Sequence, residues 1–219
     1  MSIVVQWMTS LLKWLYDLTS LVGLANYGIA IILLTIIIKS LIFPLTWKQM
    51  KSMRKTMDIQ PKVQELQKKY KGDPQKLNAE IMELYKANNV NPAGGCLPIL
   101  VQLPIFWALY SALYNFGNYI ADPNQAQFLW FNLTMKDPYY ILAVLAAATT
   151  FLQTKVTSPN ASTDPTQKTM LYVMPFFFGY ISATVPAGLA LYWVTMNIVS
   201  IVQQLYINRK LEKQKAEAA

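Results

Sequence analysis

The 219-residue sequence contains no histidine and a single cysteine, Cys96. One cysteine cannot form an internal disulfide, and without histidine a transition-metal site is not expected. Histidine-based acid–base chemistry is excluded for the same reason, and the sequence contains no nucleotide-binding loop. The sequence therefore predicts no catalytic residues, no metal site and no cofactor, and the protein is not expected to be an enzyme.

Charged residues are also scarce, at 14% of the chain, whereas a typical soluble domain has about 25%. Apolar residues make up 54% and form five long runs, at residues 27–47, 97–116, 139–157, 170–185 and 187–207. Runs of this length can cross a bilayer as helices, the fourth by local thinning of the membrane. The expected fold is an all-α polytopic membrane protein with five transmembrane helices.

The first segment, residues 1–24, has a different pattern. Polar side chains recur on one helical stripe, whereas Trp7 and Trp14 fall on the opposite side. This pattern favours an amphipathic helix lying in the membrane interface, where tryptophan is enriched. An uncleaved signal sequence and an additional span are the alternatives.

Lysine and arginine are distributed unevenly between the connections. Ten of the nineteen lie within residues 48–86, whereas the 117–138 connection has only Lys136 and the turn at Pro186 has none. The positive-inside rule then places the N-terminus outside and the C-terminus in the cytoplasm.

Residues 48–90 form a basic segment that is not a span and is expected to fold as a cytoplasmic helical hairpin. Asp73 and Pro74 are suited to the first positions of its second helix, and Pro61 is expected to kink or split the first. The hairpin contains four methionines, which either serve ordinary packing or form a deformable binding face. They are Met50, Met53, Met57 and Met82.

Lys39 is the only charged residue in the run 27–47. A charge near the centre of a span costs roughly 2.5–3.5 kcal/mol on insertion scales, so it marks a functional site by default. Lys39 is eight residues from Trp47, which places it about 12 Å below the cytoplasmic boundary. No carboxylate in the other apolar runs is available to pair with it.

Polar residues on the other spans also gather in the cytoplasmic half, at helical spacing. With Lys39 they predict a hydrated cavity that is open to the cytoplasm and closed outward. Interhelical hydrogen bonding by these side chains, and snorkelling of Lys39, are the alternatives. The candidate residues are Thr35, Lys39, Gln102, Gln153, Thr157, Trp193, Asn197, Ser200 and Gln204.

Several longer motifs resemble the YidC-type membrane protein insertases of the Oxa/Alb superfamily, over about residues 26–208. The longest is NPAGGCLPILVQLPIFWALY at residues 91–110. Others are FPLT at 43–46, QMKSM at 49–53, FLWF at 128–131, DPYY at 137–140, TFLQ at 150–153 and PAGLALYW at 186–193, followed by Asn197 and Gln203–Gln204.

The resemblance implies an insertase core at 25–208 and a short basic cytoplasmic tail at 209–219. It implies a groove, open to cytoplasm and lipid, whose cation attracts the acidic extracellular part of a client, the membrane protein being inserted. That cation is usually arginine in the family and is Lys39 here. The implied setting is the bacterial cytoplasmic membrane, and the implied function is that of an insertase and chaperone.

The implied partners are nascent membrane-protein clients and the lipid bilayer, with the Sec translocon and the ribosome as further candidates and no nucleic-acid specificity. The hairpin methionines would make the first contact with a client. The alternatives are a small-solute or ion transporter or channel, and a purely structural assembly factor.

Overall fold

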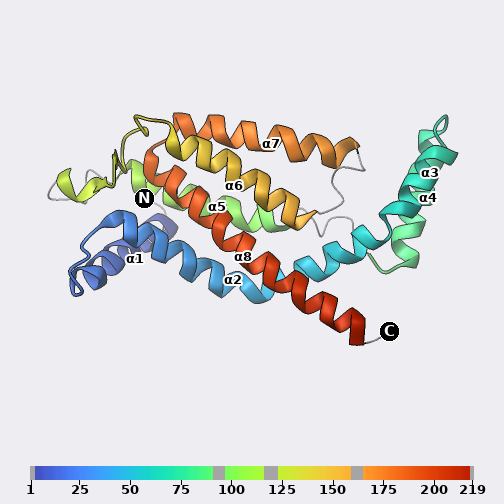
Figure 1. Ribbon diagram of the computed structural model, residues 1–219, viewed down its shortest axis with the longest axis horizontal. Coiled ribbons are helices and arrows are strands. Elements are labelled where there is room, and N and C mark those ends of the chain that lie inside the picture. The colour runs from blue at the N-terminus through green and yellow to red at the C-terminus, as the bar shows by residue number, and fades with distance from the viewer. Residues whose placement is uncertain (1–2, 91–96, 116–122, 159–164, 218–219) are drawn as a thin grey trace. The chain divides into compact units, whose positions relative to one another are not determined.

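The computed structural model describes residues 3–90, 97–115, 123–158 and 165–217 (Figure 1). These residues fold mainly into helices, with one short β-hairpin of two strands and a few turns. The all-α prediction is thereby confirmed, and Cys96 lies outside the described residues. The helices are α1 (Ile3–Ser20), α2 (Tyr27–Asp58), α3 (Gln60–Lys69), α4 (Pro74–Ala87), α5 (Leu97–Tyr114), α6 (Ile141–Thr157), α7 (Pro165–Thr184) and α8 (Ala187–Glu217). A 3-10 turn, η3 (Pro123–Ala126), precedes β1 (Gln127–Phe128), which pairs antiparallel with β2 (Phe131–Asn132).

Two helices among the described residues are long and apolar enough to cross a membrane: α2, and α8 as far as Gln214. α6 is apolar but shorter. The sequence places the starts of α2 and α8 correctly, but both helices continue past the ends of their apolar runs. In α8 the extension takes up most of the basic tail, because nothing in residues 208–217 interrupts the helix. The five-span count stays a prediction.

The chain divides into two compact units. One contains residues 1–42 and 103–219, and the other contains residues 43–102. In the first unit α6 packs against both α7 and α8 (Figure 1). The contact with α7 is close, because a Cβ at Gly179 would lie 3.1 Å from Ala147 Cβ and 3.3 Å from the Ala143 carbonyl oxygen. Small residues at such a contact let two helices pack closely inside a membrane.

The core of this unit is apolar and includes the first half of α2. Ile31 and Leu34 are fully buried, and α1 adds Leu12 and Leu15. Further along α2 the exposure rises, to 74% at Leu41. α2 is therefore enclosed at its beginning and open beyond it.

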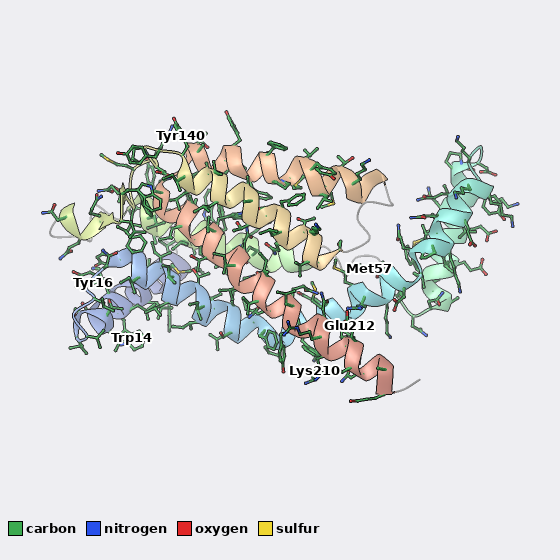
Figure 2. All side chains as sticks on the ribbon, viewed as in Figure 1. Trp14, Tyr16, Met57, Tyr140, Lys210 and Glu212 are labelled. Carbon is green, nitrogen blue, oxygen red and sulfur yellow. The ribbon has the colours of Figure 1, made fainter. Side chains whose placement is uncertain are left out.

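α1 has two apolar faces. Leu12 and Leu15 are each 1% exposed, and Tyr16 stacks on Tyr27 of α2 with ring centroids 4.2 Å apart. Trp7 and Trp14 are exposed, and Trp14 lies on the outer side of the helix (Figure 2). Helical spacing puts Leu15 next to Trp14 on the apolar side of the sequence pattern, but the structure buries it. The exposed face is suited to lipid, and its interfacial location stays a prediction.

The connection between α5 and α6 supplies partners for two helix starts. The first amides of α8 donate to this connection, from Ala187 to the Met135 carbonyl at 2.7 Å and from Gly188 to the Leu133 carbonyl at 2.9 Å. Asp137, only 3% exposed, accepts from the amide of Leu142 in α6 at 2.7 Å. Because helix starts leave amides unpaired, these bonds fix the connection onto the bundle.

The Asp137 carboxylate also accepts hydrogen bonds from within the α5–α6 connection. Asp137 Oδ1 accepts from the indole nitrogen of Trp130 at 3.0 Å and from the amide of Tyr139 at 3.2 Å. At the start of α2, Asn26 donates to the Gln127 carbonyl at 2.9 Å and accepts from the amide of Gly28 at 2.7 Å. Both ends of the connection are therefore tied by buried or partly buried polar groups.

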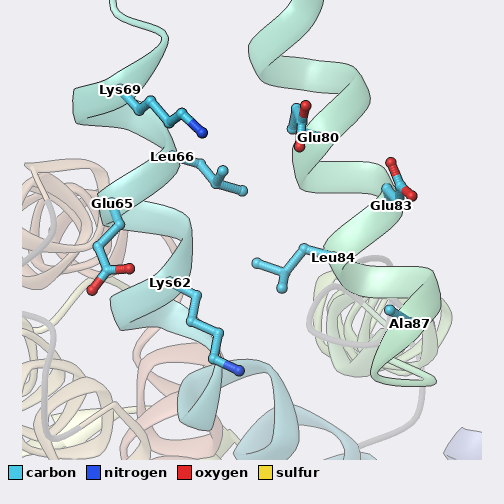
Figure 3. Close-up of a pocket in the computed structure, with 8 residues that line it drawn as sticks. All are labelled: Lys62, Glu65, Leu66, Lys69, Glu80, Glu83, Leu84 and Ala87. Carbon is cyan, nitrogen blue, oxygen red and sulfur yellow. The ribbon is translucent and has the colours of Figure 1, made fainter.

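The second unit contains the end of α2 and the α3–α4 hairpin. α2 ends at Asp58 and α3 begins at Gln60, which confirms the predicted interruption near Pro61. Asp73 caps α4 by accepting from the amide of Lys76 at 3.0 Å, with Pro74 in its first turn, again as predicted. The cavity between α3 and α4 measures about 470 Å³ (Figure 3). Its lining combines apolar and charged side chains, Lys62, Glu65, Leu66, Lys69, Glu80, Glu83, Leu84 and Ala87.

Candidate functional site

Lys39 lies on α2, just after the enclosed first half of that helix, and is partly buried. No carboxylate of the described residues pairs with its ammonium. Its backbone carbonyl accepts a hydrogen bond from Gln203 Nε2 of α8 at 3.1 Å. The cation therefore lies in an apolar helix without a charged partner in the described part of the chain, which leaves it available to an anionic ligand.

Thr35 lies one turn before Lys39 and is 1% exposed. Its hydroxyl donates to the Ile31 carbonyl of the same helix at 2.7 Å. Thr35 is thus closed off by packing, and the part of α2 that leaves polar groups accessible begins beyond it.

Asn197 forms the centre of a polar cluster between α6 and α8, and is itself 1% exposed. Its amide lies 3.0 Å from Thr149 Oγ1 and 2.9 Å from Thr150 Oγ1. The amide nitrogen turns toward Gln153 Oε1, because the reverse orientation would bring two oxygens within 2.5 Å of each other. A buried polar group needs such partners, and this cluster therefore holds α6 and α8 in one register.

Trp193 is held on three sides. Its ring stacks on Phe178 of α7 at 4.1 Å between centroids and meets Phe106 of α5 edge-on at 6.2 Å. Its indole nitrogen donates to Thr150 Oγ1 of α6 at 3.2 Å. Trp193 thereby connects α8 to three other helices, next to the Asn197 cluster.

Nearer the end of α6 the polar residues of α8 differ in their burial. Ser200 and Thr157 are partly buried, and the Ser200 hydroxyl donates to the Met196 carbonyl at 2.7 Å. Gln204 is 7% exposed and donates to Asn208 Oδ1 at 2.8 Å. Asn208 in turn donates to the Val156 carbonyl of α6 at 3.3 Å, so this end of the helix pair is also hydrogen-bonded.

The structure thus brings together Gln153, Trp193 and Asn197, and it places Lys39 beside α8 through Gln203. Gln102 belongs to the second unit and is partly buried there. The hairpin methionines belong to that unit too, with Met82 47% exposed and Met50, Met53 and Met57 partly buried.

Sequence reasoning missed Gln203 as a site residue. It lies next to Gln204, which the helical spacing selects, but outside the exact i, i+4, i+7 series. A usable signal was Pro44, which stands five residues after Lys39 and weakens the backbone hydrogen bonding of that stretch. A polar side chain from another helix was to be expected there.

Comparison with known proteins places the chain in a family. The family described as "60Kd inner membrane protein" matches residues 17–215. The chain is 48% identical over 210 residues to a membrane protein insertase YidC of Wolinella succinogenes, and 46% identical over 206 residues to one of Helicobacter pylori. The Wolinella match covers 95% of this chain and 38% of that protein. The Helicobacter match covers 94% of this chain and 36% of that protein.

A solved structure gives the same result. The fold is similar, with a TM-score of 0.73 and 30% identity, to the crystal structure titled "Active YidC insertase crystal structure with the first transmembrane domain resolved". The match covers 91% of this chain and 45% of that one. The chain spans less than half the length of each of these proteins. It belongs to the 60Kd inner membrane protein family, that of the YidC-type insertases.

Proposed function

We propose that this protein inserts small or single-span membrane proteins from the cytoplasm into the bilayer through a positively charged groove. The observation that carries the proposal is Lys39, a partly buried cation on an apolar helix without a carboxylate partner among the described residues. Its position, one to two turns past the buried Ile31 and Leu34, gives the groove a closed end. The relatives named as membrane protein insertases support the same activity.

The physical barrier to insertion is desolvation of the client's polar tail. A client's apolar segment favours lipid, but its tail has to cross about 30 Å of hydrocarbon. A water-filled groove through the cytoplasmic half of the bilayer shortens the apolar distance. Lys39 provides a transient partner for an acidic tail, and Gln153, Thr157 and Ser200 offer replaceable hydrogen bonds. The client then leaves sideways, driven by burial of its apolar segment in lipid.

The buried polar residues have a supporting role in this proposal. Asn197 connects α8 to α6, and Gln204 bonds to Asn208 within α8. Thr35 lies at the closed end of the groove, and Trp193 packs against three helices. Gln102, which belongs to the second unit, stays a prediction from the sequence. Because a client has to be released, weak and solvated contacts serve better than tight ones, and no bond is made or broken.

The second unit is proposed to receive clients first. The α3–α4 hairpin carries basic residues that suit anionic lipid headgroups. Met82 on α4, and Met50, Met53 and Met57 at the end of α2, offer adaptable apolar contacts. The proposed topology has five spans, an outer N-terminus and a cytoplasmic C-terminus, in the bacterial cytoplasmic membrane. The Sec translocon and the ribosome are proposed as further partners.

The decisive experiment is reconstitution of the purified chain alone in lipid vesicles. A single-span client with a short acidic tail is added from outside, and entry of the tail is measured as protection from protease. Proteoliposomes should protect the tail and empty vesicles should not. Ion conductance or solute uptake without client insertion would instead indicate a channel or transporter, and vesicles that insert nothing would indicate an assembly factor.

The topology is tested by labelling single cysteines introduced at Gln6 and Lys13, in a chain with Cys96 replaced by serine. Both α1 positions are exposed, so a membrane-impermeant thiol reagent should label them from outside intact cells. A cysteine at Lys213 of α8 is the matched position for the inner side. Labelling of the α1 positions only after the cells are opened would refute the proposed orientation.

A further inference from the structure

The part of α2 that carries Lys39 has an incomplete backbone ladder. Pro44 lies inside the helix and has no amide hydrogen, so the carbonyl of Ser40, four residues earlier, lacks its usual donor. A proline ring also pushes the preceding turn open, which leaves nearby carbonyls accessible to donors from other helices. Lys39, one residue before Ser40, receives such a donor from α8.

That donor is the side-chain amide of Gln203. Its Nε2 lies 3.1 Å from the Lys39 carbonyl oxygen. The bond also fixes which way the amide faces, because a flip of the amide would place Oε1 against the Lys39 carbonyl, oxygen to oxygen. Gln203 Oε1 is therefore held as an acceptor, on the side of the amide away from the Lys39 backbone.

The held oxygen is buried, and no hydrogen-bond partner for it is found in the described residues. Buried amide oxygens are rarely left unpaired, because the lost interaction with water is not replaced. The side-chain amide of Gln203 thus has a satisfied donor and an unsatisfied acceptor. It lies against the backbone of Lys39, whose side chain is the cation of the proposed groove.

We propose that Gln203 Oε1 is a client-binding group that accepts a hydrogen bond from a backbone N–H of the client's polar tail while Lys39 attracts its carboxylate. This inference rests on the proposed function and names a second recognition element of the same groove. An extended tail has unpaired amides as well as charge, and both are costly to carry through a poorly hydrated passage. A fixed acceptor beside the cation addresses the amides, which Lys39, having only donors, cannot do.

The test compares two variants of α8 and two clients. Gln203→Met removes both polar atoms at similar length, and Val202→Met, at a position 62% exposed beside it, is the matched control. The clients have the same acidic tail, but in one of them the residues flanking the acid are alanines and in the other they are prolines, which lack the N–H. Initial insertion rates are measured in proteoliposomes, with thermal unfolding of each variant measured in parallel.

The expected quantity is the ratio of the two rates. The wild type and Val202→Met should insert the alanine client about five- to tenfold faster than the proline client, the size expected for one hydrogen bond. Gln203→Met should reduce this ratio to near one. A residue that only held the helices together would slow both clients equally and leave the ratio unchanged, and that outcome would overturn the inference.

The two proposals fail differently. If wild-type vesicles insert neither client, the proposed insertase activity itself is wrong. If the wild type inserts both clients and depends on Lys39, but Gln203→Met keeps the wild-type ratio, only the role of Gln203 is refuted. A loss of thermal stability in Gln203→Met does not disturb the comparison, because both rates come from the same preparation.

Discussion

Reversing the charge at position 39 is the most direct test of the electrostatic role. An ion pair at 4 Å is worth about 1 kcal/mol in bulk water and about 4 kcal/mol at an effective dielectric constant of 20. Because Lys39 is only partly buried, the lower part of this range applies, about 1.5 kcal/mol. Lys39→Ala should therefore slow insertion of an acidic-tailed client roughly tenfold.

Lys39→Glu replaces attraction by repulsion of similar size, so the expected loss is about a hundredfold. Lys39→Arg keeps the charge and should retain most of the activity. Insertion rates are measured in proteoliposomes with two clients that differ only in an acidic or a neutral tail. The neutral client is the internal control, because its rate should depend little on the charge at this position.

Salt provides an independent check of the same reasoning. Raising the ionic strength from 0.1 to 1 M shortens the Debye length from about 10 Å to about 3 Å, so the advantage of wild type over Lys39→Ala should shrink. A Lys39→Glu variant that inserts the acidic client as fast as wild type would refute the electrostatic role. An equal loss of insertion rate for the acidic and the neutral client would also refute this role, because it would indicate damage to the fold.

Three further predictions concern the packing that closes the bundle, each measured as the thermal midpoint of the detergent-solubilised protein. A Cβ at Gly28 would overlap the Phe128 ring, so Gly28→Ala should cost about 1–3 kcal/mol. Asp137→Ala removes a buried acceptor of three hydrogen bonds and should cost about 1–3 kcal/mol. Gly179→Leu should cost more than Gly179→Ala, because Ala147 leaves little space on α6.

Gly72 and Gly23 are the two candidate positions for a control of the glycine substitutions. Both have open space where a Cβ would lie, but Gly23 has a positive φ of 75°, so Gly72→Ala is the control free of backbone strain. Gly72→Ala should leave the free energy of unfolding within about 0.5 kcal/mol of wild type. A Gly28→Ala protein as stable as Gly72→Ala would show that the α5–α6 connection does not pack on α2 as described.

Much of the fold could be read from local patterns. The starts of α2 and α8 coincide with the starts of their apolar runs, and Asp73 and Pro74 mark the start of α4, because a helix start depends on residues within one turn. Helix ends were placed less well. α8 continues far past Ile207, since no proline or glycine stops it, and the polarity of a segment does not by itself end a helix.

The candidate site was predicted only in part. The spacing of Trp193, Asn197, Ser200 and Gln204 places them on one side of α8, but their different depths of burial depend on which helix packs against each turn. Asn197 faces Thr149 and Thr150 of α6 and is enclosed, whereas Ser200 is only partly so. The spacing of residues along the sequence shows which side of a helix they lie on. How deeply each is buried depends on which other helix packs against that side.

The helical, membrane-type character of the chain and the place of Lys39 in an apolar run can be read from the residues alone, because both follow from composition and from the length of apolar runs. What surrounds Lys39 depends on how the helices pack. The bond from Gln203 to the Lys39 carbonyl joins residues 164 positions apart, and no local pattern specifies such a partner. Contacts of this kind arise when helices pack, where each unpaired polar group has to find a partner within a few ångströms.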